Sequence, residues 1–165
     1  MNIRKTEPAD LTAVMRIYHH AQQFMQENGN PGQWGTRYPM EELIREDIAE
    51  GTSYVGTDEA GQVHMVFRFV TGADPTYQEI WDGGWLNEEP YGVIHRIASD
   101  GQVKGALKAC LDFCDTIIPN IRIDTHEKNV VMRHSLAKYG FVECGRINTD
   151  DGTERIAFQR IKNTK

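Results

Sequence analysis

A strand–helix–strand–helix succession between residues 90 and 141 constrains the fold of this chain more than any other feature. The segment "PYGVIHRIAS" alternates in the manner of a strand, and an apolar stripe at helical spacing follows it, from Leu107 to Cys114. "IRIDT" alternates again, and "HEKNVVMRHSLAKYGF" has helical spacing before Gly140, which tolerates the left-handed backbone of a helix end. This order predicts an α/β domain.

The rest of the chain adds strands and two further helices around this segment. No repeat, low-complexity stretch or linker interrupts it, so we predict one mixed α/β domain over residues 1–165. The helix that begins after residue 101 is expected to start near Gln102, and Thr6 is expected to cap the first helix. The other expected elements are a strand at residues 2–5, helices within residues 6–28 and 40–49, two strands around a turn at residues 58–61, and two strands around a turn at residues 150–152.

The charge balance limits the classes of ligand. A net charge of -6 argues against a general nucleic-acid binder, because such proteins need a basic surface to release counterions from the phosphates. Any anionic ligand must therefore be held by local positive charge. No apolar run approaches the length of a membrane span and the start, "MNIRKTEPAD", lacks an apolar leader, so we expect a cytoplasmic protein with no membrane partner.

The three cysteines do not form a recognisable metal or disulfide pattern. Cys110 and Cys114 lie four residues apart in a stretch otherwise filled with leucine and phenylalanine, and Cys144 is distant in the sequence. A zinc site needs further ligands at suitable spacing, and we find none. The sequence therefore predicts small buried side chains in a reducing compartment and no metal site.

A small basic turn, "DGQVKGALKAC", precedes the helix in the central segment. A helix N-terminus has unpaired amides and a partial positive charge, which favour a phosphate group. Gly105 allows a close approach of the backbone, and Lys104 and Lys108 supply positive charge that the protein as a whole lacks. The alternative is an ordinary strand-to-helix turn with solvated lysines.

Two motifs of this segment resemble those of the GNAT family of N-acetyltransferases. In that family a strand ends and the pattern Q/R-x-x-G-x-G/A opens a helix, and here the pattern reads "QVKGAL" at residues 102–107. "IRIDTHEKNVVMRHSLAKYGF" resembles the family's second motif, a strand followed by an asparagine-bearing helix that ends in Gly-Phe. The resemblance extends over the whole chain, and it implies a mixed central sheet with helices on both faces.

The resemblance also implies a site for acetyl-CoA, the acyl donor. The diphosphate would lie on the amides of the "QVKGAL" turn, and the pantetheine arm would run beside the preceding strand at Ile97 and Ala98. Asn129 would reach the pantetheine or the phosphates from the later helix. The implied residues of the turn and helix start are Gln102, Val103, Lys104, Gly105, Ala106, Leu107 and Lys108.

Two residues depart from the family pattern. Leu107 stands where the family has glycine or alanine, and we expect it to turn into the apolar stripe of its helix. Many members have a tyrosine seven residues after the asparagine, as the general acid for the departing thiolate, but this chain has Leu136. Tyr139 is expected to pack in the core. A thiolate is a tolerable leaving group, so the loss of this acid would slow the reaction without abolishing it.

The implied reaction is direct attack of a primary amine on the thioester. It needs a base for the amine proton and an N–H donor for the oxyanion, which the family takes from the strand near Ile97. His95 is the first candidate base, because strict alternation places it on the same face as Ile97 and imidazole titrates near neutral pH. Its alternative is a hydrogen-bonded, half-buried histidine. Glu79 and Asp82 are weaker candidates on a nearby turn.

Aromatic residues mark the expected acceptor site. The family places it near the first helix–loop–helix, which here includes Trp34 and Tyr38 in the loop "GNPGQWGTRYP". Loop aromatics often line ligand sites, although packing under the loop is an equal alternative. His126 and His134 lack a partner at ligand spacing and are less persuasive as functional residues.

The sequence leaves three functions open. The first is acetyl-CoA-dependent transfer of an acetyl group to a primary amine of a small molecule or a peptide. The second is a non-catalytic acyl-CoA sensor with a degraded site, which Leu107 and Leu136 keep open. The third is an unrelated binder of a phosphate ligand, which the asparagine motif disfavours. A homodimer is one option for the assembly.

Overall fold

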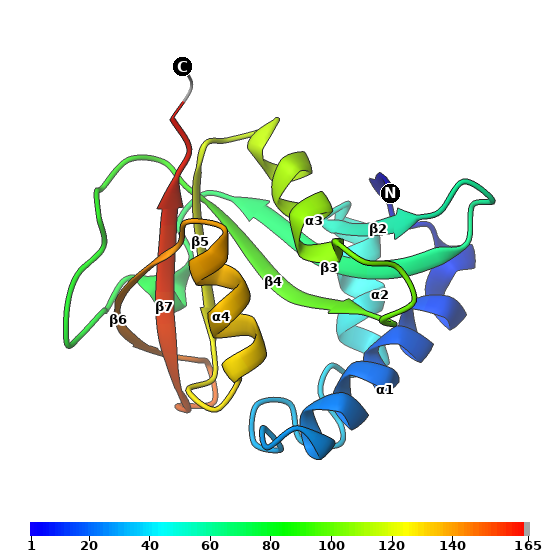
Figure 1. Ribbon diagram of the computed structural model, residues 1–165, viewed down its shortest axis with the longest axis horizontal. Helices are drawn as coiled ribbons and strands as arrows, with labels where there is room; N and C mark the ends of the chain where they lie inside the picture. The colour runs from blue at the N-terminus through cyan, green and yellow to red at the C-terminus, as the bar shows by residue number, and fades with distance from the viewer. Residues whose placement is uncertain (164–165) are drawn as a thin grey trace. The chain divides into compact units, whose positions relative to one another are not determined.

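The helices and strands follow the predicted order in the computed structural model, which describes residues 1–163 (Figure 1). Each α-helix and each strand that the sequence predicts is present within this part of the chain. The elements are β1 Asn2–Lys5, η1 Pro8–Asp10, α1 Leu11–Glu27, α2 Glu41–Glu50, β2 Ser53–Thr57, β3 Val63–Thr71, η2 Pro75–Tyr77, β4 Gly92–Ser99, α3 Ala106–Asp115, β5 Asn120–Thr125, α4 Val130–Lys138, β6 Val142–Asn148 and β7 Glu154–Ile161, where η denotes a 3-10 helix.

The seven strands form one mixed sheet in the order β1-β2-β3-β4-β5-β7-β6. The pairs β1–β2, β2–β3, β5–β7 and β6–β7 are antiparallel, whereas β4 and β5 are parallel, with Gly92 opposite Ile121 and Val93 opposite Arg122. The parallel pair is joined through α3, as a crossover connection requires. This confirms the predicted α/β class and the mixed sheet.

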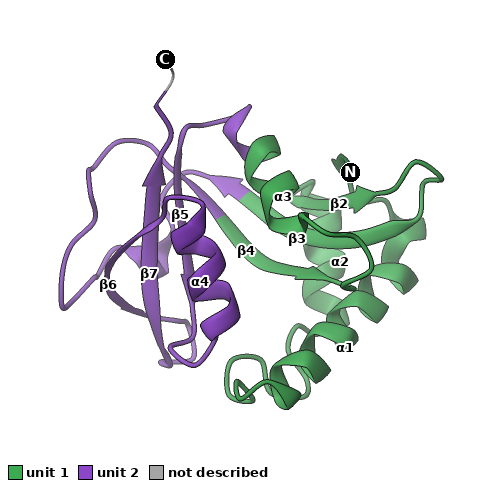
Figure 2. Ribbon diagram, viewed as in Figure 1, with its two compact units in different colours: residues 1–69, 94–113 green, residues 70–93, 114–165 purple. Residues whose placement is uncertain are grey.

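The chain divides into two compact units, which are coloured separately in Figure 2. Unit 1 comprises Met1–Phe69 and Ile94–Phe113, and unit 2 comprises Val70–Val93 and Cys114–Lys165. The strand β4 passes from unit 2 into unit 1 after Val93, so the predicted coenzyme turn and most of its preceding strand lie in unit 1.

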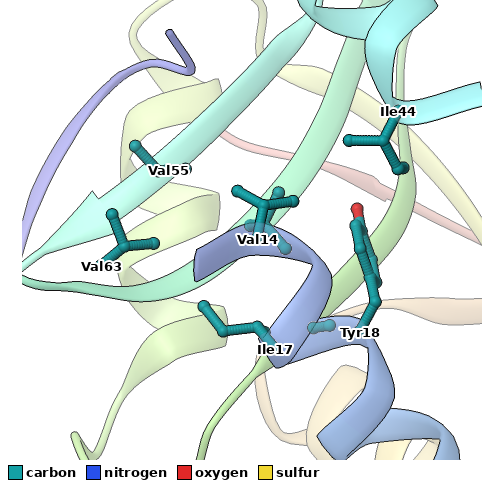
Figure 3. Close-up of a cluster of buried hydrophobic side chains, with 8 residues drawn as sticks. Val14, Ile17, Tyr18, Ile44, Val55 and Val63 are labelled. Atoms are coloured by element: carbon teal, nitrogen blue, oxygen red, sulfur yellow. The ribbon is translucent and has the colours of Figure 1, made fainter. Parts of the chain in front are cut away.

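Unit 1 has helices on both faces of its strands. Neighbouring residues of a strand point to opposite faces, and on β2 Val55 packs with α1 and α2 whereas Tyr54 contacts Phe113 of α3, with ring centroids 5.0 Å apart. Figure 3 shows side chains of the cluster beneath α1 and α2. Its buried members are Val14, Ile17, Tyr18, Ile44, Val55, Val63, Val66 and Ala98.

Unit 2 is built on β5, β6 and β7 and combines an apolar cluster with a polar one. The apolar cluster consists of Tyr77, Tyr91, Val93, Ile147 and Ala157. In the segment between η2 and β4, a brief antiparallel bridge joins Trp81 to Arg146. The polar cluster is formed by three amide side chains, Asn87, Asn120 and Gln159.

Two predicted helix starts are wrong. The helix α3 begins at Ala106 instead of near Gln102, because the Asp100 carboxylate accepts the Gln102 N–H and holds a turn in competition with the helix. Thr6 does not cap α1. Its hydroxyl is buried against Ser53 Oγ at 2.7 Å, and the 3-10 turn η1 separates Thr6 from the start of α1 at Leu11.

The helices that the structure describes also bear on membrane association. Among residues 1–163, none of them combines the length and the apolar character needed to cross a membrane.

Candidate functional site

The turn between β4 and α3 adopts a conformation that depends on glycine. Gly101 and Gly105 have φ angles of +73° and +80°, in the left-handed region that side chains other than glycine rarely adopt. A Cβ added at either position would meet no atom within 4 Å. The two glycines are therefore required by the backbone conformation, and the space above them is open.

The amides of this turn are available to a ligand. Within the described residues, the backbone N–H groups of residues 103–107 make no hydrogen bond, whereas Ala109 N–H already donates to Gly105 O at 2.9 Å. Lys104 is exposed beside them. The Lys108 ammonium forms an ion pair with Asp112 at 2.7 Å, so part of its charge is already compensated. The predicted group of turn residues is thus brought together at one helix start.

A histidine that the sequence analysis did not select supports this turn. His64 on β3 contacts the Asp100 carboxylate through Nδ1 and the Asp58 carboxylate through Nε2, each at 2.8 Å. Asp100 in turn accepts the Gln102 N–H. The sequence signal for this cluster is a histidine on a predicted strand and an aspartate at each of two predicted turns. This combination is too common to identify the cluster.

The strand β4 is not regular at the predicted pantetheine position. Arg96 has a φ of +51°, a left-handed conformation that is unusual for a residue with a side chain and that interrupts the alternation of the strand. His95 and Ile97 flank it and are both half-buried, and Ala98 is buried. The alternation that led us to place His95 on the same face as Ile97 therefore does not continue through this point.

Three groups hold Arg96 in this strained conformation. The Tyr18 hydroxyl on α1 donates to its carbonyl oxygen at 2.9 Å, and burial raises the pKa of Tyr18, so that this hydroxyl stays protonated. The Arg96 guanidinium donates to Asp47 Oδ2 on α2 at 2.5 Å and to the Tyr38 hydroxyl at 3.2 Å. Arg68 Nε lies 3.3 Å from the other Asp47 oxygen. Positive φ persists only where neighbours fix it in this way.

The two predicted acceptor-site aromatics lie against this Arg96 cluster. Trp34 is half-buried against the unit 1 core and packs edge-on to Tyr18, with ring centroids 5.8 Å apart. Tyr38 is 38% exposed, and its ring lies 6.0 Å from that of Trp34. Trp34 thus has a packing role, while Tyr38 presents part of its ring to solvent and its hydroxyl to Arg96. The sequence analysis found the aromatics but missed Tyr18, Asp47 and Arg96.

Four of the residues that the sequence analysis discusses lie in unit 2. Asn129 is the N-cap of α4, and its side-chain oxygen accepts the Met132 N–H at 3.2 Å. Leu136, which stands at the position of the family's general acid, is fully buried and belongs to the core. Glu79 is exposed on the segment after η2, and the neighbouring Asp82 is exposed as well, with a φ of +55°.

The remaining histidines and the cysteines give no second site. His126 accepts the Lys128 N–H, and burial lowers its pKa, while His134 is exposed on α4. All three cysteines are buried, as the sequence predicts. Within residues 1–163, no group of three or more His, Cys, Asp or Glu side chains is placed to hold a metal ion.

Solved structures of acetyltransferases share this architecture. A GNAT-family acetyltransferase from Streptococcus agalactiae is 31% identical in sequence, with a TM-score of 0.89 over 99% of this chain and 96% of its own. This chain belongs to the GNAT family. The fold is also shared by a GNAT acetyltransferase from Listeria monocytogenes, at 19% identity with 98% and 94% of the two chains covered and a TM-score of 0.70. No family model and no curated protein sequence matches the chain.

A third structure connects this fold with the coenzyme. The NatB acetyltransferase complex, solved with CoA bound, matches 99% of this GNAT chain and all of its own compared chain, at 16% identity and a TM-score of 0.62. At that identity the likeness shows the fold alone. Family membership confirms the predicted resemblance, and it leaves the roles of individual residues to be argued from their geometry.

Proposed function

We propose that this GNAT protein transfers an acetyl group from acetyl-CoA to a primary amine of a small molecule or a peptide. The observation that carries the proposal is the row of unengaged amides at residues 103–107, in the turn between β4 and α3 whose two glycines, Gly101 and Gly105, have open space where a Cβ would lie. A diphosphate fits such a turn because the amides and the helix dipole both favour an anion.

The residues around the turn fit the rest of the coenzyme. Lys104 is exposed beside the amides and adds a positive charge in an acidic protein. The backbone of Ile97 and Ala98, on the strand that leads into the turn, is where the pantetheine arm would lie, in the manner of an added strand.

The chemistry requires a base and an oxyanion donor from this chain. Bound acetyl-CoA would supply the activated acyl group: the amine would add to the thioester carbonyl, and the C–S bond would then break with CoA leaving as a thiolate. His95 is the proposed base: it lies on β4, it is half-buried, and imidazole can accept the amine proton near neutral pH. The backbone N–H of Ile97, next to the left-handed Arg96, is the proposed oxyanion donor. Glu79 remains a secondary candidate for the base.

The acceptor amine is proposed to bind beside Tyr38. Tyr38 presents a partly exposed ring, and its hydroxyl accepts a hydrogen bond from the Arg96 guanidinium, whose charge is balanced by the buried Asp47 carboxylate. An amine can approach the ring face through a cation–π contact. Trp34 packs between the Tyr38 ring and the buried Tyr18, and so helps to hold the Tyr38 ring in place.

A specific observation favours a second candidate, a non-catalytic acyl-CoA sensor. Leu136 stands at the position of the family's general acid, and its aliphatic side chain has no proton to give to a departing thiolate. Turnover separates the two functions: the protein is incubated with acetyl-CoA and a panel of primary amines, and free thiol is measured. The enzyme releases thiol in an amine-dependent manner, whereas a sensor binds CoA without releasing thiol.

His95→Ala tests the assignment of the base. If His95 accepts the proton, the variant should lose about a hundredfold in rate at neutral pH, while its affinity for CoA stays nearly unchanged. His20→Gln, at an exposed position on α1, is the matched control and should retain the full rate. An unchanged rate in His95→Ala would exclude it as the base.

Lys104→Glu tests the proposed diphosphate site at the turn between β4 and α3. Saturating CoA, at about a hundred times its Kd, should stabilise the wild-type protein by about 2.7 kcal/mol in a thermal unfolding experiment. The variant should need a higher CoA concentration for the same shift, because its charge now opposes the diphosphate. Arg16→Glu, at an exposed position on α1, changes the net charge equally and controls for long-range effects.

A further inference from the structure

One buried histidine, His64, contacts two aspartates, and one of them begins the proposed coenzyme turn. His64 is 4% exposed on β3, and its two ring nitrogens each lie 2.8 Å from a carboxylate oxygen, Nδ1 from Asp100 Oδ2 and Nε2 from Asp58 Oδ2. Asp58 comes from the turn between β2 and β3, and Asp100 from the turn between β4 and α3. These are the charged groups that act on His64 from the elements around it.

This geometry identifies the protonation state of the ring. A neutral imidazole has one N–H donor and one lone pair, so one of its nitrogens would face a carboxylate oxygen with no proton between them. With both carboxylates ionised, only the imidazolium form places a proton in each of the two 2.8 Å contacts. The pKa of His64 is accordingly raised, first by the hydrogen bond that the ring donates to Asp58 and then by the one that it donates to Asp100.

His64 also fixes the start of the coenzyme turn. Its own carbonyl oxygen accepts the Asp100 N–H at 3.0 Å, so both its backbone and its ring hold Asp100. The second oxygen of Asp100 accepts the Gln102 N–H at 3.0 Å, which sets the direction in which the chain enters the left-handed turn. A path of direct contacts thus leads from the imidazolium to the backbone that precedes the open amides.

We propose that His64 is a positioning residue for the coenzyme turn, and that binding of the coenzyme diphosphate is coupled to the protonation of His64. The inference rests on the proposed function, since it concerns the same turn. With the imidazolium, the three groups carry a net charge of -1, and without its proton they carry -2 next to a site for an anion. Loss of the proton also releases one of the two carboxylates, because the neutral ring can donate to only one.

The direction of the effect follows from this charge. The proton is present below the raised pKa of His64 and is lost as the pH increases through it. Affinity for CoA should therefore be highest on the acidic side of this pKa and should weaken on the basic side, on the order of threefold for one unit charge near a solvated turn. By linkage, CoA must raise the pKa of His64 in return.

The test is the Kd of CoA, measured by calorimetry from about pH 6 to about pH 9. For the wild-type protein, the Kd of CoA should rise about threefold as the pH increases, with a single midpoint pH. Asp58→Asn should move this midpoint to lower pH, since the histidine loses one of its two acidic partners, while the amide oxygen can still accept the Ala60 and Gln62 amides that Asp58 Oδ1 now engages. Titration of the coenzyme's own phosphate is common to all variants and cancels in the comparison.

Two controls make the outcome decisive. His20→Gln, at an exposed position on α1, should reproduce the wild-type profile. His64→Gln should bind CoA more weakly at low pH and lose the midpoint; should it fail to fold, the shift in Asp58→Asn and the pH titration of the His64 ring by NMR, with and without CoA, still decide the matter. A merely structural His64 would leave the midpoint where it is in Asp58→Asn.

The failure of this inference is distinguishable from failure of the proposed function. If the folded protein binds CoA with a Kd that is the same across the pH range, or with the same midpoint in Asp58→Asn, the coupling to His64 is overturned and the coenzyme site stands. If the folded protein binds no CoA at any pH, the proposed function is overturned together with it.

Discussion

The two units bury an arginine in different ways. In unit 1 the Arg96 guanidinium is 10% exposed and donates to the Asp47 carboxylate, which Arg68 also contacts. In unit 2 Arg122 is 4% exposed and lies between two aromatic rings, 4.1 Å from the centroid of Trp85 and 3.9 Å from that of Tyr91. Each guanidinium leaves its Nε without a hydrogen bond partner among the described residues.

The difference lies in what balances the charge. Arg96 is paired with an ion, and the pair holds a strained backbone next to the partly exposed Tyr38. Arg122 donates instead to a neutral acceptor, the Asn87 carbonyl oxygen, at 2.9 Å, and burial lowers its pKa. An ion pair at a strained strand is the arrangement expected of a functional site, whereas a stacked arginine within a network of amides is the arrangement of a core.

Asp47→Asn should give the largest loss of stability. It leaves Arg96 and Arg68 without their shared carboxylate, and breaking a buried pair from one side costs about 3–5 kcal/mol. The free energy of unfolding in urea measures this loss. Glu46→Gln, at the exposed neighbouring position on α2, should change it little. A loss for Asp47→Asn as small as that of the control would mean that the ion pair does not hold unit 1 together.

Arg122→Met should cost less, about 2 kcal/mol, because no opposite charge is left behind. The variant loses the two cation–π contacts and leaves the Asn87 carbonyl unsatisfied, but the apolar side chain still fills the space between the rings. Urea unfolding again provides the measurement. Arg122→Lys keeps the charge without the planar group, so if it is as stable as the wild type, stacking contributes nothing.

The sequence predicted most of the fold because local patterns determine it. Strand alternation and helical spacing identified every α-helix and strand of the described residues, and the glycine at position 105 marked the turn that opens α3. The start of that helix was placed four residues too early, since the competing hydrogen bond from Gln102 to Asp100 is a matter of geometry that periodicity does not contain.

The candidate site was less predictable, because its key contacts join residues distant in the sequence. Arg96 meets Asp47 and Tyr38 across 49 and 58 positions, and His64 meets Asp100 across 36. Nothing in the alternating "VIHRIAS" indicates that Arg96 is left-handed, and strict alternation made His95 and Ile97 neighbours on one face. This deviation arises from the tertiary contacts of Arg96 with Tyr18, Tyr38 and Asp47, and only the structure reveals them.

Arg96→Gly and Arg96→Ala separate the strain at Arg96 from its ion pair. Both variants lose the guanidinium, but only glycine accepts a φ of +51° without cost. The glycine variant should therefore be more stable than the alanine variant by about 1 kcal/mol, the reverse of the usual order within a strand. At Arg122, a regular β5 position, the same two substitutions should follow the usual order. Equal stabilities of the two Arg96 variants would show that the backbone relaxes to a negative φ once the guanidinium contacts are lost.

The pH dependence of stability should reveal the smallest difference between the polar clusters of the two units. Unit 1 contains His64, whose pKa is raised by its two acidic partners, so the stability it contributes is fully present below the ordinary histidine pKa of about 6.5 and is lost as the pH rises through the raised value. The amides of unit 2 do not titrate in this range.

Urea unfolding of two variants measures this difference. The loss of stability caused by His64→Gln should shrink as the pH rises from about 6 to about 9, while the loss caused by Gln159→Met stays constant. A constant loss in both variants would mean that the pKa of His64 is the same in the folded and unfolded chains, and His64 would then not distinguish the two units.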